Sequence, residues 1–245
     1  MSAAVYDVPE PSEASLADDA DNHLRTQFLR RIAHDIASPT GVTMTVLDEL
    51  STSDKPRPEL LAMARRSLRR LMRLSEQLAL CAELEGGCLE PERTAADIRE
   101  ITKRAVEDAV AIDGRRDVTA ETKLPDGGVL MPADGRLLVS VIREAVGNAL
   151  KFACSKVLVT ITVEGANAVI RIEDDGPGFP ADALATLGRR FVRRSASRGL
   201  GLSLSMAVEI VGDHGGTVTV ETSSLPPGRR GIAGAALVIA LPLAG

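Results

Sequence analysis

The first part of the chain repeats apolar residues at alternating intervals of three and four, the spacing typical of amphipathic helices. From Asn22 this pattern predicts a first helix, one face of which is formed by Phe28, Ile32, Asp35, Pro39, Val42, Val46 and Leu50. Residues 51–58, STSDKPRP, have the composition of a turn. A second helix follows, with a coiled-coil seam formed by Leu61, Ala64, Leu68, Leu71, Ser75, Leu78 and Ala82. Gly86 and Gly87 end it, and Pro91 prevents its return.

These two predicted helices form an antiparallel hairpin over residues 22–90. Two helices alone cannot enclose a hydrophobic core, so we expect the hairpin to pair with a second copy into a dimeric four-helix bundle. The polar, acidic and proline-containing residues 1–21 before the hairpin are predicted to be a flexible tail.

From residue 95 onwards the pattern changes to a mixture of helices and strands. Helices are predicted at 95–112, 135–152 and 199–213, and strand-like runs lie at 118–122, 129–131, 216–222 and 235–241. The segments KVLVTITVEG and AVIRIEDDG alternate apolar and polar residues, which indicates a β-hairpin. Residues 95–245 therefore read as an α+β domain, an α/β sandwich with helices packed on one face of a mixed sheet.

Composition narrows the class of protein. The formal net charge of the 245 residues is −5, and six acidic residues precede the first basic one, Arg25, so the body is nearly neutral. The chain has no Trp and one Tyr, so it offers few aromatic side chains on which nucleic-acid bases could stack, and we expect no nucleic-acid partner. No apolar run is long enough for membrane insertion, and no signal peptide is visible. Three cysteines without a metal-type spacing favour a reducing, cytoplasmic setting.

Basic residues gather on the second helix, at Arg65, Arg66, Arg69, Arg70 and Arg73. We interpret them as a solvated face. A nucleic-acid-binding helix would explain the same charges, but no DNA-reading motif accompanies them.

Two helical motifs carry candidate chemistry. In FLRRIAHDIASP, the adjacent Asp35 can hold one ring nitrogen of His34 protonated and leave the other as a nucleophile, although for the isolated pair a surface histidine beside an acid is the favoured reading. In REAVGNALKFA, Glu144, Asn148 and Lys151 share one helix face and suit a hard cation with phosphates, although a solvated face would look the same.

Two glycine-rich motifs follow. DDGPGF places Asp174 beside Gly176 and Gly178 at a strand end, where glycines let the backbone approach a ligand; a tight surface turn is the alternative. RGLGLSLSMAVEIVGDHGG opens a helix with Gly199 and Gly201, whose free N–H groups can bind phosphate. His214, after this helix, is interpreted as part of its C-terminal turn without a catalytic role.

In this order, the four motifs resemble the H box, N box and two glycine boxes of the catalytic core of bacterial two-component sensor histidine kinases, over residues 24–241. The resemblance implies a homodimer with a Bergerat-type ATP-binding domain. It further implies that His34 takes the γ-phosphoryl group of ATP and passes it to an aspartate of a response-regulator receiver domain. Input would come from a separate sensor protein or from further parts of a longer chain.

The resemblance also implies roles for individual residues. Asp35 would orient and activate His34, and Ser38 stands where the family positions a phosphatase water. Asn148 would bind Mg²⁺ with Glu144 in its shell, and Lys151 would contact phosphate. Asp174 would accept a hydrogen bond from the adenine amino group. The pocket and its lid would be shaped by Gly176, Gly178, Gly199 and Gly201.

Some positions depart from the family pattern and leave rival readings open. Gly188 replaces an aromatic residue and Ser197 a glycine, changes that we expect to weaken nucleotide affinity. The first rival is a catalytically silent phosphotransfer or scaffold protein of the same architecture. The second is an ATPase of the gyrase or mismatch-repair type, against which the hairpin with His34 argues.

Overall fold

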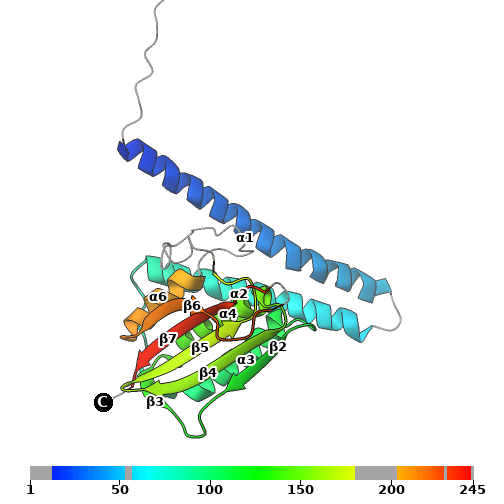
Figure 1. The fold of residues 1–245 in the computed structure, drawn as a ribbon. Coiled ribbons are helices and arrows are strands. Elements are labelled where there is room, and N and C mark those ends of the chain that lie inside the picture. The colour runs from blue at the N-terminus through cyan, green and yellow to red at the C-terminus, as the bar shows by residue number, and fades with distance from the viewer. Residues whose placement is uncertain (1–12, 53–56, 180–202, 229–230, 244–245) are drawn as a thin grey trace, which may run out of the picture.

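The computed structural model describes residues 13–52, 57–179, 203–228 and 231–243. The chain begins with a hairpin of two long helices, α1 (Glu13–Thr52) and α2 (Pro58–Glu85). They lie closest near their connection and diverge towards the N-terminal end of α1 (Figure 1). Gly86 caps α2 through a hydrogen bond to the carbonyl of Ala82, and Gly87 takes a positive φ of 62°. The predicted end of the second helix is therefore confirmed.

Helix α1 begins earlier than the sequence pattern indicated. Residues 13–21, which the sequence pattern assigned to the tail, are part of this helix, so its predicted start at Asn22 is wrong. This segment, EASLADDAD, contains residues with good helix propensity. The helix also continues through Pro39, which lies inside it and is buried.

The remainder of the chain alternates strands and helices. In chain order the elements are β1 (Thr94–Asp97), α3 (Ile98–Asp113), β2 (Thr119–Lys123), β3 (Leu130–Ala133), α4 (Gly135–Phe152), β4 (Lys156–Glu164), β5 (Asn167–Asp174), α6 (Ser203–Asp213), β6 (Thr217–Thr222) and β7 (Ala235–Pro242). One sheet has the order β2-β4-β5-β7-β6, with β2 and β4 parallel and the other pairs antiparallel. The predicted mixed sheet is confirmed, whereas residues 95–97 belong to β1, paired with β3, and not to a helix.

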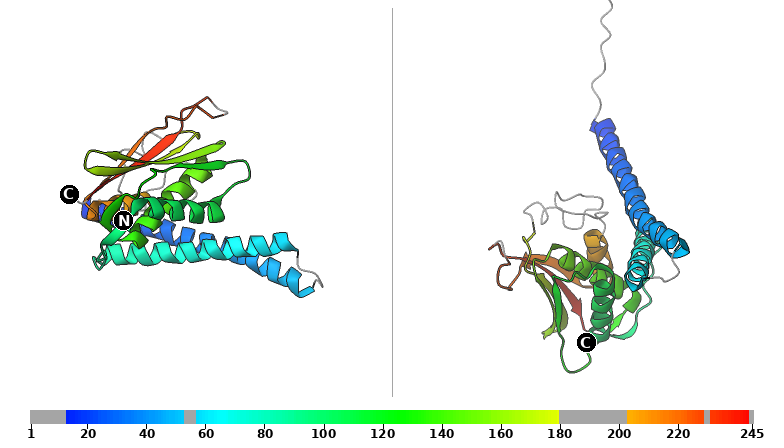
Figure 2. Two further views of the ribbon diagram at one scale, coloured as in Figure 1. Left: turned by 90° about the horizontal axis from the view of Figure 1, so that it is seen from below. Right: turned by 90° about the vertical axis from the view of Figure 1, so that its right-hand side faces the viewer.

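The molecule is layered, with the sheet on one side, α3, α4 and α6 in the middle, and the hairpin beyond them (Figure 2). Across the sheet, Ile170 pairs with Ile161 and with Ile239, and all three are buried. One apolar cluster joins these strands to the three helices and to α2. The predicted α+β architecture, with helices on one face of the sheet, is confirmed.

The two hairpin helices differ in how well the pattern identified their buried face. Every position predicted to face inward on α1 is buried or half-buried, and Val46 is 2% exposed. On α2, the fully buried apolar residues of the core cluster are Leu74, Leu80, Cys81 and Leu84, none of which belongs to the predicted seam, whereas the seam residue Leu78 is half-buried and packs against the same cluster. The seam residues Leu61 and Leu68 remain 38% and 49% exposed.

Aspartate caps fix the starts of the two central helices. Asp97 accepts a hydrogen bond from the backbone of Arg99 at the start of α3, and Asp134 accepts from Arg136 and Leu137 at the start of α4. His214, buried after α6, accepts from the backbone N–H of Asp134 at 3.0 Å, and its Nδ1 lies 2.7 Å from the carbonyl oxygen of Ile210. It thus ties α6 to the start of α4, a structural role that fits its predicted place in a turn.

Among the described helices, none is long and apolar enough to cross a bilayer.

Candidate functional site

His34 and Asp35 lie side by side on α1. The His34 Nδ1 is 3.3 Å from the Asp35 Oδ1, and the two side chains are 80% and 31% exposed. An ionised carboxylate only accepts hydrogen bonds, so this contact favours the tautomer protonated at Nδ1 and leaves the lone pair on Nε2. The orienting role of Asp35 stays a prediction.

A cavity of about 100 Å³ lies between the hairpin and α4. Five helices supply its charged and polar lining. These residues are Asp35 of α1, Arg70, Arg73 and Gln77 of α2, Asp113 of α3, Glu144, Asn148 and Lys151 of α4, and Ser203 of α6. Thus the structure brings four predicted site residues together from two distant motifs. His34 and Ser38 do not line this cavity, and both are exposed on α1.

Glu144 is the most buried acid of this cavity, with a side chain 6% exposed. Arg73 holds both of its oxygens, with Nε 2.5 Å from Oε1 and Nη2 2.8 Å from Oε2. Arg73 also pairs with Asp113 at the end of α3, and the Ser203 hydroxyl donates to Glu144 at 3.2 Å. One carboxylate of α4 is therefore bound by both α2 and α6.

Arg73 corrects the prediction of a solvated basic face. The other arginines, at positions 65, 66, 69 and 70, are exposed as expected, but the Arg73 side chain is only 14% exposed. Burial acts against its charge, yet the hydrogen bonds and negative charges of Glu144 and Asp113 more than offset this and raise the pKa of Arg73 above its ordinary value.

Lys151 closes the α4 side of the cavity, and its ammonium lies 5.5 Å from the centre of the Phe152 ring. Burial lowers the pKa of Lys151, the positive charges of Arg70 and Arg73 add to this effect, and Asp113 and Asp35 oppose it. The cation therefore lies within the electrostatic reach of both α1 and α2.

Two adjacent aspartates at the end of β5 have different environments. Asp175 accepts hydrogen bonds from the backbone of Cys154, Ser155 and Lys156 and from the Ser155 hydroxyl. These bonds more than offset burial and lower the pKa of Asp175. Asp175 therefore fixes the connection between α4 and β4, and its oxygens are occupied by protein donors.

Asp174 is 5% exposed and has fewer partners. Within the described residues its hydrogen bonds, from the N–H groups of Gly176 and Ala235, both end on Oδ1. Burial raises the pKa of Asp174 to about 6, which the two backbone bonds oppose and the charge of Asp175 reinforces. The remaining oxygen, Oδ2, is available to accept from a ligand.

The glycines beside Asp174 are required by their surroundings. A Cβ at Gly176 would lie 2.4 Å from the carbonyl oxygen of Phe152 and 2.7 Å from Oδ1 of Asp174. Gly178 has a φ of 75°, which side-chain-bearing residues rarely adopt. The predicted Gly199 and Gly201, together with Gly188 and Ser197, lie outside the described residues.

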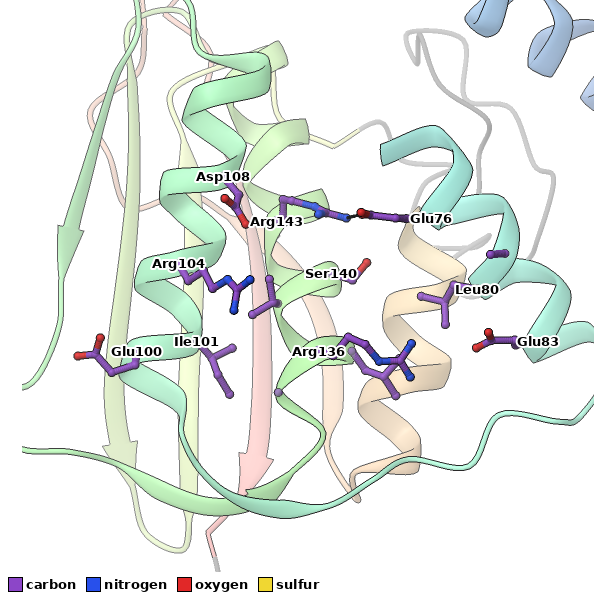
Figure 3. A pocket seen from close by; sticks show the side chains of 14 residues that line it. Glu76, Leu80, Glu83, Glu100, Ile101, Arg104, Asp108, Arg136, Ser140 and Arg143 are labelled. Atoms are coloured by element: carbon purple, nitrogen blue, oxygen red, sulfur yellow. Dashed lines mark hydrogen bonds and ion pairs between the residues drawn. The ribbon is translucent and has the colours of Figure 1, made fainter. Parts of the chain in front are cut away.

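A larger cavity, of about 690 Å³, lies between α2, α3 and α4 and contains none of the predicted site residues (Figure 3). Across it, the Arg143 guanidinium of α4 reaches the Glu76 carboxylate of α2 at 2.9 Å (Figure 3). Two neighbouring ion pairs therefore join α2 to α4. In one, α2 supplies the arginine (Arg73 with Glu144), and in the other, α2 supplies the glutamate (Glu76 with Arg143).

The donor set fits a magnesium nucleotide. Asn148 and Glu144 offer the oxygen ligands that Mg²⁺ prefers, Lys151 and Arg70 offer positive charge to phosphates, and Asp174 offers an acceptor to a base. The smaller cavity is below the roughly 300 Å³ of a typical ligand pocket, so it can house the phosphate end only. Among the described residues, no group of three or more His, Cys, Asp or Glu side chains could hold a metal ion.

The sequence patterns missed Arg73, Asp113 and Ser203. Arg73 belongs to a run of arginines with the same spacing and composition, and no local signal separates it from its neighbours. Asp113 and Ser203 stand at a helix end and a helix start, where polar residues are expected in any case.

Comparisons with known proteins agree with this geometry. Residues 133–245 match the family described as "Histidine kinase-, DNA gyrase B-, and HSP90-like ATPase". The chain is 29% identical over 247 residues to the signal transduction histidine-protein kinase AfsQ2 of Streptomyces coelicolor, which covers 91% of this chain and 44% of that protein. It is 33% identical over 230 residues to the sensor histidine kinase TrcS of Mycobacterium tuberculosis, which covers 86% of this chain and 44% of that protein. The chain thus spans less than half the length of these relatives.

Solved structures support the fold. The mycobacterial sensor histidine kinase MprB superposes with a TM-score of 0.54 at 24% identity, covering 61% of this chain and 98% of that one. Full-length ShkA, solved in complex with AMPPNP, superposes with a TM-score of 0.60 at 22% identity, covering 89% of this chain and 46% of that one.

Proposed function

We propose that this chain is an ATP-dependent protein-histidine kinase that carries the catalytic core of the two-component sensor histidine kinases, which its similarity to members of that family supports. His34 takes the γ-phosphoryl group of ATP, and an aspartate of a response-regulator receiver domain receives it. One observation carries the proposal: Asp35, the neighbour of the phosphoacceptor on α1, lines the same cavity as Glu144, Asn148 and Lys151 of α4.

The phosphoryl step follows from the His34 contact. The Nε2 lone pair attacks the γ-phosphorus, the bond between that phosphorus and the β,γ-bridging oxygen breaks, and ADP leaves with the electron pair. Asp35, on Nδ1, stabilises the positive charge that develops on the imidazole. Attack of the receiver carboxylate on the phosphohistidine then regenerates the neutral imidazole.

In this proposal the nucleotide is bound by residues of α4 and β5. Asp174 accepts from the adenine amino group through Oδ2, and Gly176 and Gly178 let the base approach the backbone. Lys151 contacts a phosphate, and Asn148 with Glu144 holds Mg²⁺. When bound, Mg²⁺ neutralises negative charge on the phosphates.

A second copy is part of the proposal. Large apolar side chains remain exposed along both hairpin helices: Leu29, Ile36, Met44 and Leu47 on α1, and Leu61, Met63, Leu68 and Met72 on α2. Exposed apolar side chains along both helices are typical of an association surface, and a homodimeric four-helix bundle would bury many of them. Input would then arrive from a separate sensor protein or from further parts of the whole protein.

Ser38 carries the proposed phosphatase function. It is exposed on α1, one helical turn after His34. A hydroxyl there would position a water for hydrolysis of the phosphorylated receiver.

The test is incubation with γ-labelled ATP and Mg²⁺, alongside His34→Ala and, as a matched control on the same helix, Ser38→Ala. We expect an acid-labile, alkali-stable label that His34→Ala abolishes and Ser38→Ala retains. Nucleotide binding without any label would support the scaffold reading instead, and a label that survives His34→Ala would contradict the assignment of the phosphoacceptor.

A further inference from the structure

The strongest unassigned feature is the contact of Arg73 with the nucleotide-site carboxylate Glu144. Arg73 comes from α2, outside the ATP-binding domain, yet its guanidinium holds both oxygens of Glu144. We propose that Arg73 is a positioning residue of the nucleotide site, which competes with the metal of the bound nucleotide for Glu144 and thereby sets nucleotide affinity. The inference rests on the proposed function only in taking Glu144 as part of the Mg²⁺ shell.

The contact is built for an arginine. A second acid, Asp113, pairs with Nη1. All three nitrogens of the Arg73 guanidinium are therefore engaged by carboxylates. Gly147, on α4 directly before Asn148, leaves the space: a Cβ there would lie 3.0 Å from Nη2 of Arg73 and 2.8 Å from Oδ2 of Asp113. The Arg73 guanidinium is thus held by two acids and lies against the backbone of a glycine. This distinguishes the contact from an incidental ion pair on the surface.

The charges explain the competition. A buried carboxylate needs a cation, and Arg73 satisfies Glu144 in the structure. A metal ion that approaches Glu144 must share or displace this guanidinium, because both use the same oxygens. Arg73 would then be released towards Arg70 and Lys151, where phosphate charge is proposed to bind. Nucleotide binding and the α2 contact are therefore linked, and each weakens the other.

The neighbouring ion pair offers a matched control. Glu76 of α2 and Arg143 of α4 join the same two helices at 2.9 Å, across the larger cavity and without touching Glu144 (Figure 3). Glu76→Gln loosens α2 from α4 as Arg73→Gln does, but it leaves the Glu144 oxygens bound. Comparing the two variants separates competition at Glu144 from a general effect of docking the hairpin.

The experiment measures binding of a fluorescent, non-hydrolysable ATP analogue by anisotropy, over a titration of Mg²⁺, to the full chain and its variants. We expect Arg73→Gln to lower the Kd roughly 5- to 50-fold and to lower the Mg²⁺ concentration needed for half-saturation. Arg73→Lys, which keeps the charge but loses the fork, should fall between. Glu76→Gln and the exposed Arg69→Gln should stay within about twofold of the wild type.

Two results would overturn the inference. Weaker nucleotide binding in Arg73→Gln would make Arg73 a phosphate ligand, and an equal gain in Glu76→Gln would assign the effect to hairpin docking. Circular dichroism of each variant confirms that it is folded. Because these measurements require no phosphoryl transfer, they can fail while His34 is still phosphorylated, and they can succeed in a chain that transfers no phosphate.

Discussion

Replacing Asp174 by asparagine should stabilise the protein while it weakens nucleotide binding. The carboxylate is 5% exposed, and burial raises its pKa from 3.8 to about 6. Asparagine keeps an oxygen that can accept from the Gly176 N–H, and it removes the charge that burial disfavours.

The sign of the effect follows from proton binding. Between pH 3.8 and about 6 the folded chain holds a proton on Asp174 that the unfolded chain has released, so stability falls as pH rises through this window. Above about pH 6, the stability lost through Asp174 no longer changes with pH. A difference of two pKa units corresponds to about 3 kcal/mol, which is an upper bound for the gain of Asp174→Asn at pH 8.

The measurement is urea unfolding of the wild type and the variant at pH 8 and at pH 4. We expect Asp174→Asn to be more stable at pH 8 by up to about 3 kcal/mol, equivalent to roughly 6–12 °C in Tm. The two proteins should converge at pH 4. Lower stability of the variant at pH 8 would show that the ionised carboxylate is stabilised in the fold, contrary to this reasoning.

A binding measurement completes the prediction. If Oδ2 accepts from the adenine amino group, Asp174→Asn should weaken ATP binding at pH 8, and wild-type affinity should decrease as pH falls below about 6. Unchanged affinity in the variant would remove Asp174 from the adenine site. A residue that costs stability and supports binding is the expected behaviour of a functional carboxylate.

Three further predictions concern structure outside the ATP pocket. His214→Ala leaves the buried N–H of Asp134 without its acceptor and should cost about 2 kcal/mol in urea unfolding; a change below about 0.5 kcal/mol would mean that water replaces the imidazole. Pro39→Ala restores a backbone donor in α1 and should alter the rate of His34 phosphorylation or of phosphoryl transfer, measured with labelled ATP and a receiver domain; equal rates for both steps would reject a role for a kink. Leu68→Glu places charge on the exposed face of α2 and should dissociate the proposed dimer in sedimentation experiments, whereas an unchanged mass would exclude this face from the interface.

Elements with a strong local signal were predicted closely. The predicted helix at 135–152 matches α4, because an aspartate cap precedes a clear apolar stripe. The alternation of residues in β4 and β5 identified their hairpin, and the paired, buried Ile161 and Ile170 show why it is stable.

Elements whose stability comes from distant partners were predicted less well. β1 is four residues long, contains two alanines and lacks a period that separates it from the following helix, whereas the strand-like run predicted at 129–131 overlaps its partner β3. On α2, the heptad pattern predicted a seam of which Leu61 and Leu68 stay exposed and Leu78 is half-buried, while the fully buried residues of the core cluster are Leu74, Leu80, Cys81 and Leu84. A heptad pattern describes one face of a helix, and α2 has two apolar faces.

The same limit applies to the site. The order of the motifs indicated a nucleotide and a phosphoacceptor, but the one-residue step from His34 to Asp35 turns the two side chains by about 100° around α1. The structure shows the consequence: Asp35 lines the cavity with Asn148 and Lys151, and His34 is 80% exposed.

These positions bear on the proposed reaction. In-line attack needs Nε2 of His34 within roughly 3–3.5 Å of the γ-phosphorus, yet His34 lies outside the cavity in which phosphate is proposed to bind. Glu144, proposed for the Mg²⁺ shell, is bound by Arg73 of the hairpin. If His34 is the phosphoacceptor, the position of His34 outside the cavity and the Arg73–Glu144 contact both belong to a conformation that precedes phosphoryl transfer. The loss of the Arg73 contact on nucleotide binding would remove one of the two ion pairs that join α2 to α4, and the loosened hairpin could then turn a histidine towards the phosphate.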